Sequence, residues 1–167
     1  NVVNSGVIEA KLGRVQLSSG DTFTVDLYGD GLLEIEATDQ IGAQLVSNTG
    51  RLSADGGTVA LTAAAGKDIV DSLIVVGGQI SATTVAQRQG KIIIAAEGSN
   101  AVTGNIAENK GEKDGASRVL VNATLDASGR DEGEQGGSIE ITGDTIYLAG
   151  GVIDASGHSA PIPTPKP

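Results

Sequence analysis

The stretch that decides the fold is Asn48–Leu61, which reads NTGRLSADGGTVAL. It holds two short apolar runs, one around Leu52 and one formed by Val59 and Leu61, and a glycine precedes each. Apolar residues at alternate positions are typical of a strand with one buried face, and glycine is typical of tight corners. The stretch therefore predicts two short strands joined by a corner.

The same pair of strands recurs along the chain. The first member, a small-residue turn followed by x-aliphatic-x-Ala, occurs at 4–10, 48–54, 77–82, 122–127 and 150–155. The second member, a glycine followed by alternating aliphatic residues, occurs at 13–17, 57–61, 90–94 and 137–141. Leu52 and Leu125 are 73 residues apart, and so are Ile80 and Ile153. These separations are multiples of roughly 22 to 25 residues, the usual length of a solenoid repeat.

A parallel β-helix explains this pattern, because equivalent residues of successive coils then stack as inward-facing aliphatic ladders. We therefore expect an all-β chain with about seven coils. One domain is expected over 1–157, with loops near 105–116 and 128–136 and one short helical turn allowed within 62–75. Residues 158–167 are expected to form a Pro-rich extended tail. A β-sandwich also has short strands, but it gives no reason for the repeated 73-residue spacing.

Composition excludes several functional classes. The 167 residues include 25 glycines, one histidine and no cysteine, methionine or tryptophan. The lack of cysteine excludes disulfide frameworks, zinc fingers and thiol catalysis. A net charge of −10 disfavours nucleic acid and anionic membranes as partners, and no apolar run has the length of a membrane helix. No cofactor and no enzymatic activity are expected. Because Asn1 is not a start residue, we expect a processed chain or a fragment.

A partial calcium-loop motif lies at 26–31. Asp26 and Asp30 occupy its first and fifth positions, followed by Gly31. A calcium loop also needs an oxygen ligand at the third position and a glutamate at the twelfth, which are Tyr28 and Ala37 here. The motif therefore favours a strand–turn–strand, with calcium at Asp26 and Asp30 as a weak alternative.

Acidic residues form a second cluster, in the loop at 128–136. Asp131, Glu132 and Glu134 lie there, with Asp126 nearby. Converging carboxylates bind divalent cations or serve in acid–base catalysis when a rigid frame fixes them. In a glycine-rich loop, a solvated surface is the favoured interpretation. The lone His158, between two serines, lacks the rigid nucleophile and oxyanion hole that a catalytic triad needs.

Two further surface features are weak candidates. Asn122 begins an Asn-Ala-Thr glycosylation sequon, although it also fits a corner residue equivalent to Asn4 and Asn48. Tyr28 and Tyr147 are two of the few aromatic residues. They are the residues that a glycan- or receptor-binding surface would need.

Most of 1–157 resembles the large secreted exoproteins of the filamentous-haemagglutinin type. The resemblance is carried by 13–21, 25–33, 48–54, 56–63 and 148–157. It implies a right-handed parallel β-helix that is exported across the bacterial outer membrane by a two-partner secretion system. It also implies an outer-membrane secretion partner and a location at the cell surface. The family's N-terminal Asn-Pro-Asn type motifs are absent, so no export signal is assigned.

These features together predict a secreted structural protein, either an adhesin shaft or a subunit of an extracellular filament. A β-helix exposes unpaired strand edges at both ends, and head-to-tail stacking of copies covers them without closing a ring. The expected junction residues are Val2, Val3, Val7, Pro161, Ile162 and Pro163. The alternatives are a glycan- or receptor-binding adhesin module that does not polymerise, and, less favoured, a polysaccharide-degrading β-helix enzyme.

Overall fold

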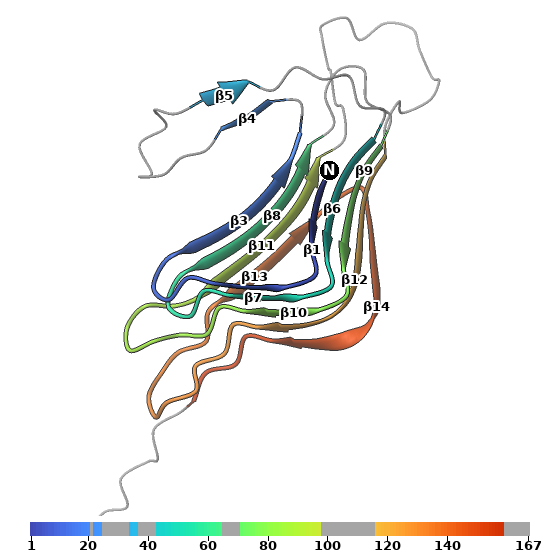
Figure 1. Ribbon diagram of the computed structural model, residues 1–167. Helices are drawn as coiled ribbons and strands as arrows, with labels where there is room; N and C mark the ends of the chain where they lie inside the picture. The colour runs from blue at the N-terminus through green and yellow to red at the C-terminus, as the bar shows by residue number, and fades with distance from the viewer. Residues whose placement is uncertain (21, 25–33, 37–42, 65–70, 98–115, 159–167) are drawn as a thin grey trace, which may run out of the picture.

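The fold is taken from a computed structural model, which describes residues 1–20, 22–24, 34–36, 43–64, 71–97 and 116–158. These residues form strands and connections and contain no helix (Figure 1). The strands are β1 (Val2–Asn4), β2 (Val7–Glu9), β3 (Arg14–Ser19), β4 (Thr22–Thr24), β5 (Glu34–Glu36), β6 (Ala43–Asn48), β7 (Arg51–Ser53), β8 (Thr58–Ala64), β9 (Asp71–Val76), β10 (Gln79–Ser81), β11 (Lys91–Glu97), β12 (Ala116–Asp126), β13 (Ser138–Thr142) and β14 (Thr145–Asp154).

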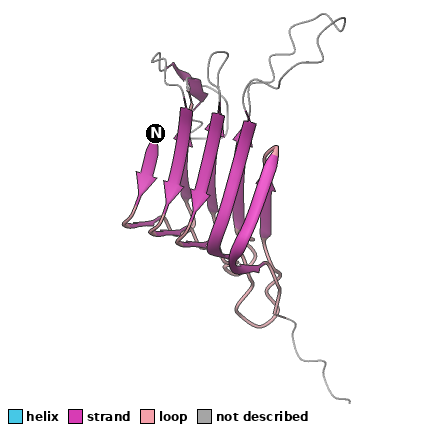
Figure 2. Ribbon diagram, turned by 90° about the vertical axis from the view of Figure 1, so that its right-hand side faces the viewer, coloured by secondary structure: helices cyan, strands magenta, loops and turns pink. Residues whose placement is uncertain are grey.

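The strands stack in three parallel rows, as a β-solenoid requires (Figure 2). The first row is β1, β6, β9 and the first halves of β12 and β14. The second row is β2, β7, β10 and the second halves of β12 and β14. The third row is β3, β8, β11 and β13. The chain passes through the three rows in order and then returns to the first. We call each such passage a layer, so layer 1 holds β1, β2 and β3.

The register of the rows confirms the two repeat members predicted from sequence. Ile8, Leu52, Ile80, Leu125 and Ile153 are successive partners in the second row. The third row aligns the second members in the same way, through its inward-facing pairs. Those pairs are Val15↔Val59, Val59↔Ile92 and Ile92↔Ile139, with Leu17↔Leu61, Leu61↔Ile94 and Ile94↔Ile141.

The expected number of seven coils is wrong for these strands, which stack in five layers. The cause lies in the first row, where Val2, Val46, Ile74, Val119 and Ile146 are successive partners. Long layers of 44 or 45 residues alternate there with short layers of 28 or 27 residues. The 73-residue spacing is therefore two unequal layers and not three equal ones.

The extra residues of the long layers lie between the third row and the next first-row strand. In layer 1 this segment includes an antiparallel pair, β4 with β5, that belongs to neither parallel sheet. The corresponding segment of layer 3 covers 98–115, which falls outside the described residues. Most of the expected loop at 105–116 falls there too. Of the range 62–75, in which the sequence allows a short helical turn, the described residues belong to strands β8 and β9. The residues between these strands, 65–70, are likewise not described.

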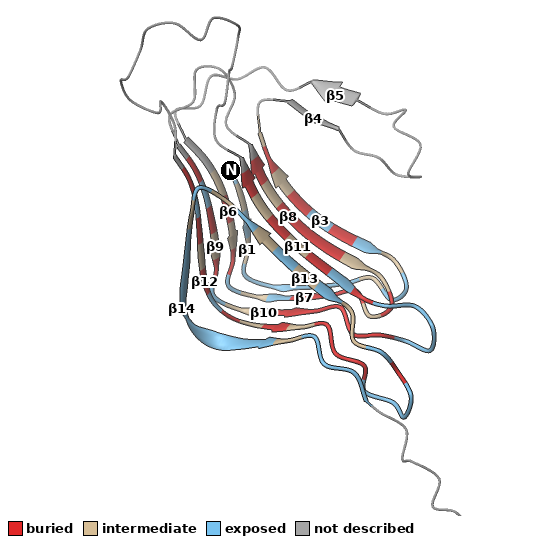
Figure 3. Cartoon of the chain, turned by 180° about the vertical axis from the view of Figure 1, so that it is seen from behind, coloured by how far each residue is buried: buried red, intermediate tan, exposed pale blue. Residues whose placement is uncertain are grey.

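The core runs along the inside of the three rows (Figure 3). Leu52, Ile80 and Leu125 have no exposed surface, because each is covered by the layer above and the layer below. Full burial of one such side chain contributes about 1.5–3 kcal/mol. No layer can bury its own apolar side alone, so stability comes from stacking.

Glycine is required where successive corners approach most closely. At Gly57 an added Cβ would lie 2.0 Å from the carbonyl oxygen of Gly13 in the layer before it. The next residue, Thr58, donates its N–H to that same oxygen at 3.0 Å. The close approach therefore serves the hydrogen bond between layers, and a side chain at Gly57 would break it.

Candidate functional site

The acidic residues of the loop at 128–136 lie at the corner between the second and third rows. Two corner segments stack there, 82–90 of layer 3 and 127–137 of layer 4. The Ala82 N–H donates to the Asp126 carbonyl at 2.8 Å, and the Thr84 N–H donates to the Ser128 carbonyl at 2.9 Å. This backbone pairing fixes the two corners against each other and so positions the polar side chains that they carry.

Glu134 joins these two corners. Its Oε1 accepts the N–H of Ala86 from layer 3 at 2.6 Å, and its Oε2 accepts the N–H groups of Arg130 and Asp131 at 3.1 and 3.0 Å. The Asp131 amide, with those of Ala86 and Arg130, lowers the pKa of Glu134. The residue is 8% exposed, so these three donors replace the water that it lost on folding.

Asp126 holds the start of the same loop. Its Oδ1 accepts the hydroxyl of Ser128 at 2.6 Å and the Ser128 N–H at 3.0 Å, and its Oδ2 forms an ion pair with Arg130. Burial raises the pKa of Asp126, but the hydrogen bonds from Ser128 and Arg130 outweigh burial, and the pKa lies below its ordinary value. The residue therefore stays ionised and fixed in place near neutral pH.

Asp55 performs a similar role between layers 2 and 3. Its Oδ1 accepts the Ser81 hydroxyl at 2.9 Å and the Thr83 N–H at 3.2 Å. Burial raises its pKa, and the donors of Ser81 and Thr83 together with the positive charge of Arg130 lower it below the ordinary value. Asp55 and Asp126 thus each accept a hydroxyl and a backbone N–H from the corner that they stabilise.

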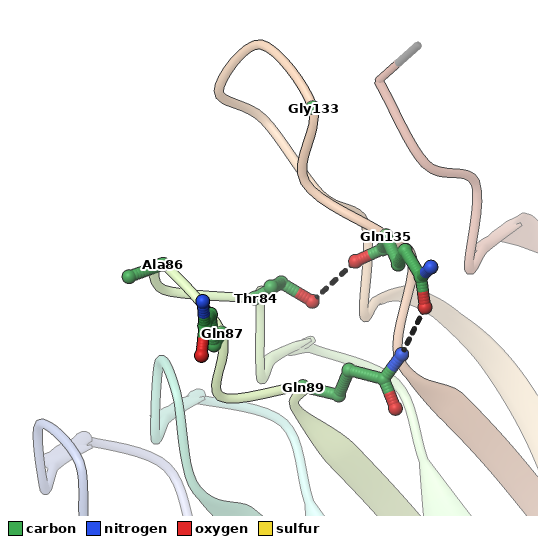
Figure 4. Close-up of a pocket in the computed structure, with 6 residues that line it drawn as sticks. All are labelled: Thr84, Ala86, Gln87, Gln89, Gly133 and Gln135. Carbon is green, nitrogen blue, oxygen red and sulfur yellow. Dashed lines mark hydrogen bonds between the residues drawn. The ribbon is translucent and has the colours of Figure 1, made fainter. Parts of the chain in front are cut away.

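A small polar hollow opens beside these corners (Figure 4). It has a volume of about 280 Å³. The Thr84 hydroxyl donates to the Gln135 carbonyl at 2.7 Å, and the Gln89 amide donates to the Gln135 Oε1 at 3.1 Å. The remaining lining residues are Ala86, Gln87 and Gly133. None of the six lining residues carries a charge or an aromatic ring, so the hollow offers uncharged hydrogen-bonding groups only.

The chemistry of this corner is structural. Asp131 and Glu132 are exposed, as expected for a solvated loop. For Glu134 that expectation is wrong, because three backbone amides bind its carboxylate inside the stacked corners. Across the residues whose positions are described, no three acidic, histidine or cysteine side chains come together to hold a metal ion. Sequence reasoning found the acidic cluster but not that Ala86, from the previous layer, binds it.

The other predicted site residues are spread over the surface. His158 is exposed, and its backbone pairs with Glu134 and Gly133 at 2.8 Å each. Asn122 is also exposed and lies at an irregularity of the β12–β14 register. The column of Asn4 and Asn48 continues through Val76 to Val121, so Asn122 is one position beyond it and is not their equivalent. Tyr147 is 58% exposed on β14. Asp26, Tyr28 and Asp30 lie outside the described residues.

Both end layers expose large apolar side chains, including two of the expected junction residues. In layer 1, Val3 and Val7 are 65% and 71% exposed, whereas Val2 is partly buried against the core. In layer 5, Leu148 and Val152 are 59% and 58% exposed on β14. Sequence reasoning missed the layer 5 residues, although they occupy the last copy of the repeat. The expected junction residues Pro161, Ile162 and Pro163 lie outside the described part of the chain.

Comparison with known proteins shows a relative over part of the chain and assigns no family. No protein-family model matches the chain, and no solved structure matches it. A part of 99 residues is 33% identical to a heme/hemopexin-binding protein of Haemophilus influenzae. The match covers 59% of this chain and 10% of that relative, so the chain spans about a tenth of the relative's length. The described residues contain no helix of the length and apolarity that a membrane span requires.

Proposed function

We propose that this chain is a structural segment of a right-handed parallel β-helix, secreted to the bacterial cell surface as an adhesin shaft or filament subunit. The resemblance to filamentous-haemagglutinin-type exoproteins supports export through an outer-membrane secretion partner. The chain acts as a scaffold and not as an enzyme, because the carboxylates of the corners bind backbone amides of their own fold.

The observation that carries this proposal is the open end layer. The central residue of the second row, Ile80, has no exposed surface, whereas Ile153 of the same column is 48% exposed on β14. The edge of β14 that faces away from β12 has no partner among the described strands. An open strand edge with apolar side chains favours the addition of a further parallel layer. A shaft uses this end for the next layer, supplied by the same polypeptide or by a second copy.

Sedimentation velocity and electron microscopy of the chain over a range of concentrations test assembly by copies. We expect particles that lengthen with concentration. The variant Ile153→Lys places a charge on the open end and is expected to leave single chains. The control Gln87→Lys adds the same charge at an exposed corner and is expected to assemble normally. A chain that stays single at every concentration contradicts the filament-subunit form of the proposal.

The similarity to the Haemophilus influenzae protein favours a second function, a binding module for a host molecule that does not polymerise. The name of that relative supplies the first two probes, heme and hemopexin. Glycans are the further class that we expect from an adhesin. Saturable binding of one probe that is lost on Tyr147→Ala would favour this function, because Tyr147 is an exposed aromatic residue. An absence of binding to every probe would reject it.

A further inference from the structure

The corner between the second and third rows is enlarged in two consecutive layers. In layer 2 the chain crosses this corner with four residues, 54–57, and the Gly57 N–H closes the turn on the Ala54 carbonyl at 2.8 Å. Layers 3 and 4 use nine and eleven residues there, 82–90 and 127–137, and both segments protrude from the solenoid (Figure 1). The third row nevertheless continues in register through layers 2, 3 and 4. Stacking of the layers therefore does not require the extra residues, and these are the residues that surround the polar hollow.

The enlarged corner of layer 3 ends in a tight turn that is held under strain. Val85 and Arg88 exchange two backbone hydrogen bonds of 3.0 Å each, and Ala86 and Gln87 form the two-residue turn between them. Ala86 has a φ of +56°, a conformation that glycine adopts freely and alanine only with strain. Its N–H donates to Glu134 at 2.6 Å, so a carboxylate of layer 4 holds the strained residue in place. Backbone strain of this kind is found mainly at functional sites, where the surrounding structure maintains it.

Three glutamine side chains of the hollow keep polar groups available for a ligand (Figure 4). Gln87 forms no hydrogen bond within the described part of the chain, so its amide offers both an NH2 group and an oxygen. Gln89 donates to Gln135 at 3.1 Å, which leaves the Gln89 oxygen and the Gln135 NH2 group without a partner there. The hollow therefore presents two amide NH2 groups and two amide oxygens.

The size of the hollow limits the ligand to one small unit. Its volume of about 280 Å³ is close to the lower limit of about 300 Å³ for small-molecule pockets. One flank is open at Gly133, where an added Cβ would meet nothing within 4 Å. The Ala86 methyl group also lines the hollow and offers a small apolar contact. These dimensions suit a single ring with its substituents, approached from the side of Gly133.

The free groups select a neutral ligand that carries several hydroxyl groups. A hydroxyl both donates and accepts, so two neighbouring hydroxyls match the NH2 group and the oxygen of one amide. A cation would find no carboxylate among the six lining residues, and an anion would find no lysine or arginine there. A purely apolar ligand would displace water from the amides without replacing its hydrogen bonds. Sugars combine the required size with the required hydroxyl groups.

We propose that this hollow binds one neutral sugar unit of a glycan through the amides of Gln87, Gln89 and Gln135. No aromatic ring lines the hollow, so the hydrogen bonds supply most of the affinity, and a dissociation constant of about 1 mM is expected for a single sugar. None of the lining residues belongs to layer 1 or layer 5. The site is therefore open in a single chain and in a stacked shaft alike, and the inference does not depend on the proposed assembly.

Titration of the full chain with the methyl glycosides of glucose, galactose, mannose and N-acetylglucosamine tests the inference, followed by NMR of the glutamine side-chain amides. We expect saturable shifts of the amide signals of Gln87, Gln89 and Gln135 with at least one of the four sugars. Gln87→Ala removes the amide that has no other partner and should weaken binding about fivefold or more. The matched control Gln16→Ala removes an exposed amide from β3 and should bind as the native chain does.

Three results would overturn the inference. The first is the absence of any saturable shift at about 20 mM of each neutral sugar, a concentration well above the expected dissociation constant. The second is equal or tighter binding of glucuronate, which would contradict a neutral ligand. The third is binding that persists in Gln87→Ala but is lost in Tyr147→Ala, which would assign the sugar to the exposed aromatic residue of the second proposed function. None of these results bears on assembly, which is tested separately by Ile153→Lys.

Discussion

The second row contains two isoleucines at equivalent positions that differ in how many layers cover them. Ile80 and Ile153 occupy the same column, but Ile80 has no exposed surface while Ile153 is 48% exposed. Replacing a fully buried isoleucine by alanine removes transfer free energy and leaves a cavity, at a cost of about 2–5 kcal/mol. Leu52 and Leu125 confine Ile80 in a rigid stack, so we expect about 3–4 kcal/mol for Ile80→Ala. For the half-exposed Ile153, about 1 kcal/mol is expected.

Urea unfolding followed by circular dichroism measures both losses. With a slope of about 2 kcal/mol per molar urea, Ile80→Ala should lower the midpoint by roughly 1.5–2 M and Ile153→Ala by about 0.5 M. The measurement is made at dilutions where the chain is a single particle. We argue that an isoleucine stabilises the fold in proportion to the layers that cover it, and not by its position in the repeat. Equal losses of unfolding free energy for the two variants at these dilutions would refute this argument.

The remaining predictions concern the corners. Gly57→Ala should destabilise the chain by more than about 3 kcal/mol, because its Cβ would meet the Gly13 carbonyl at 2.0 Å. Gly133→Ala should cost only about 1 kcal/mol, because an added Cβ would meet open space and only the φ of +82° would be strained. Thermal unfolding of the two glycine variants measures both losses. A larger loss of stability at Gly133 than at Gly57 would contradict the stacking geometry. The hydrogen bonds from Ser128 and Arg130 hold the pKa of Asp126 below its ordinary value in the folded state, so its contribution to stability is present at neutral pH and is lost as the pH falls through that lowered pKa. The stability advantage of the native chain over Asp126→Asn should therefore shrink below about pH 4, and an advantage that grows on acidification would show that Ser128 and Arg130 do not favour the ionised form.

The corner carboxylates illustrate how a solenoid uses acidic residues. Asp55 and Glu134 both bind groups from a different layer, through Ser81 and Thr83 in one case and Ala86 in the other. Each bond satisfies a backbone or hydroxyl donor at a corner where the strand ladder is interrupted. The acidity of the chain is thus partly structural, in addition to its contribution to solubility.

The repeat could be predicted because its physical signals are local. Alternating aliphatic residues mark the inward face of a strand, and a glycine marks each close corner, so both repeat members were recognised and aligned with correct register. The first row was not recognised as a member of its own. Its strands have less uniform sequences, since the column that begins with Asn4 and Asn48 continues with Val76 and Val121.

The candidate site was only partly predictable. The cluster of acids around Asp126 and Glu134 is visible in the sequence, and so is the nearness of Asp126 to Ser128 and Arg130, but Ala86, a partner of Glu134, lies 48 positions away. No local pattern indicates which corner of which layer will lie next to the loop. The bond from Ala86 to Glu134 therefore depends on the stacking of the layers, which no local pattern shows.

By itself, the sequence determined that the chain forms short, half-buried strands that repeat and that small residues are needed at the corners, because both follow from the period of two and from glycine. Only the tertiary structure decided how many residues make one layer. A spacing of 73 residues fits three equal repeats as well as two unequal layers, and backbone pairing in the first row selects the second. The tertiary structure also decided that the end layers remain open, because exposure at β13 and β14 depends on which strands lack a neighbour and not on their own residues.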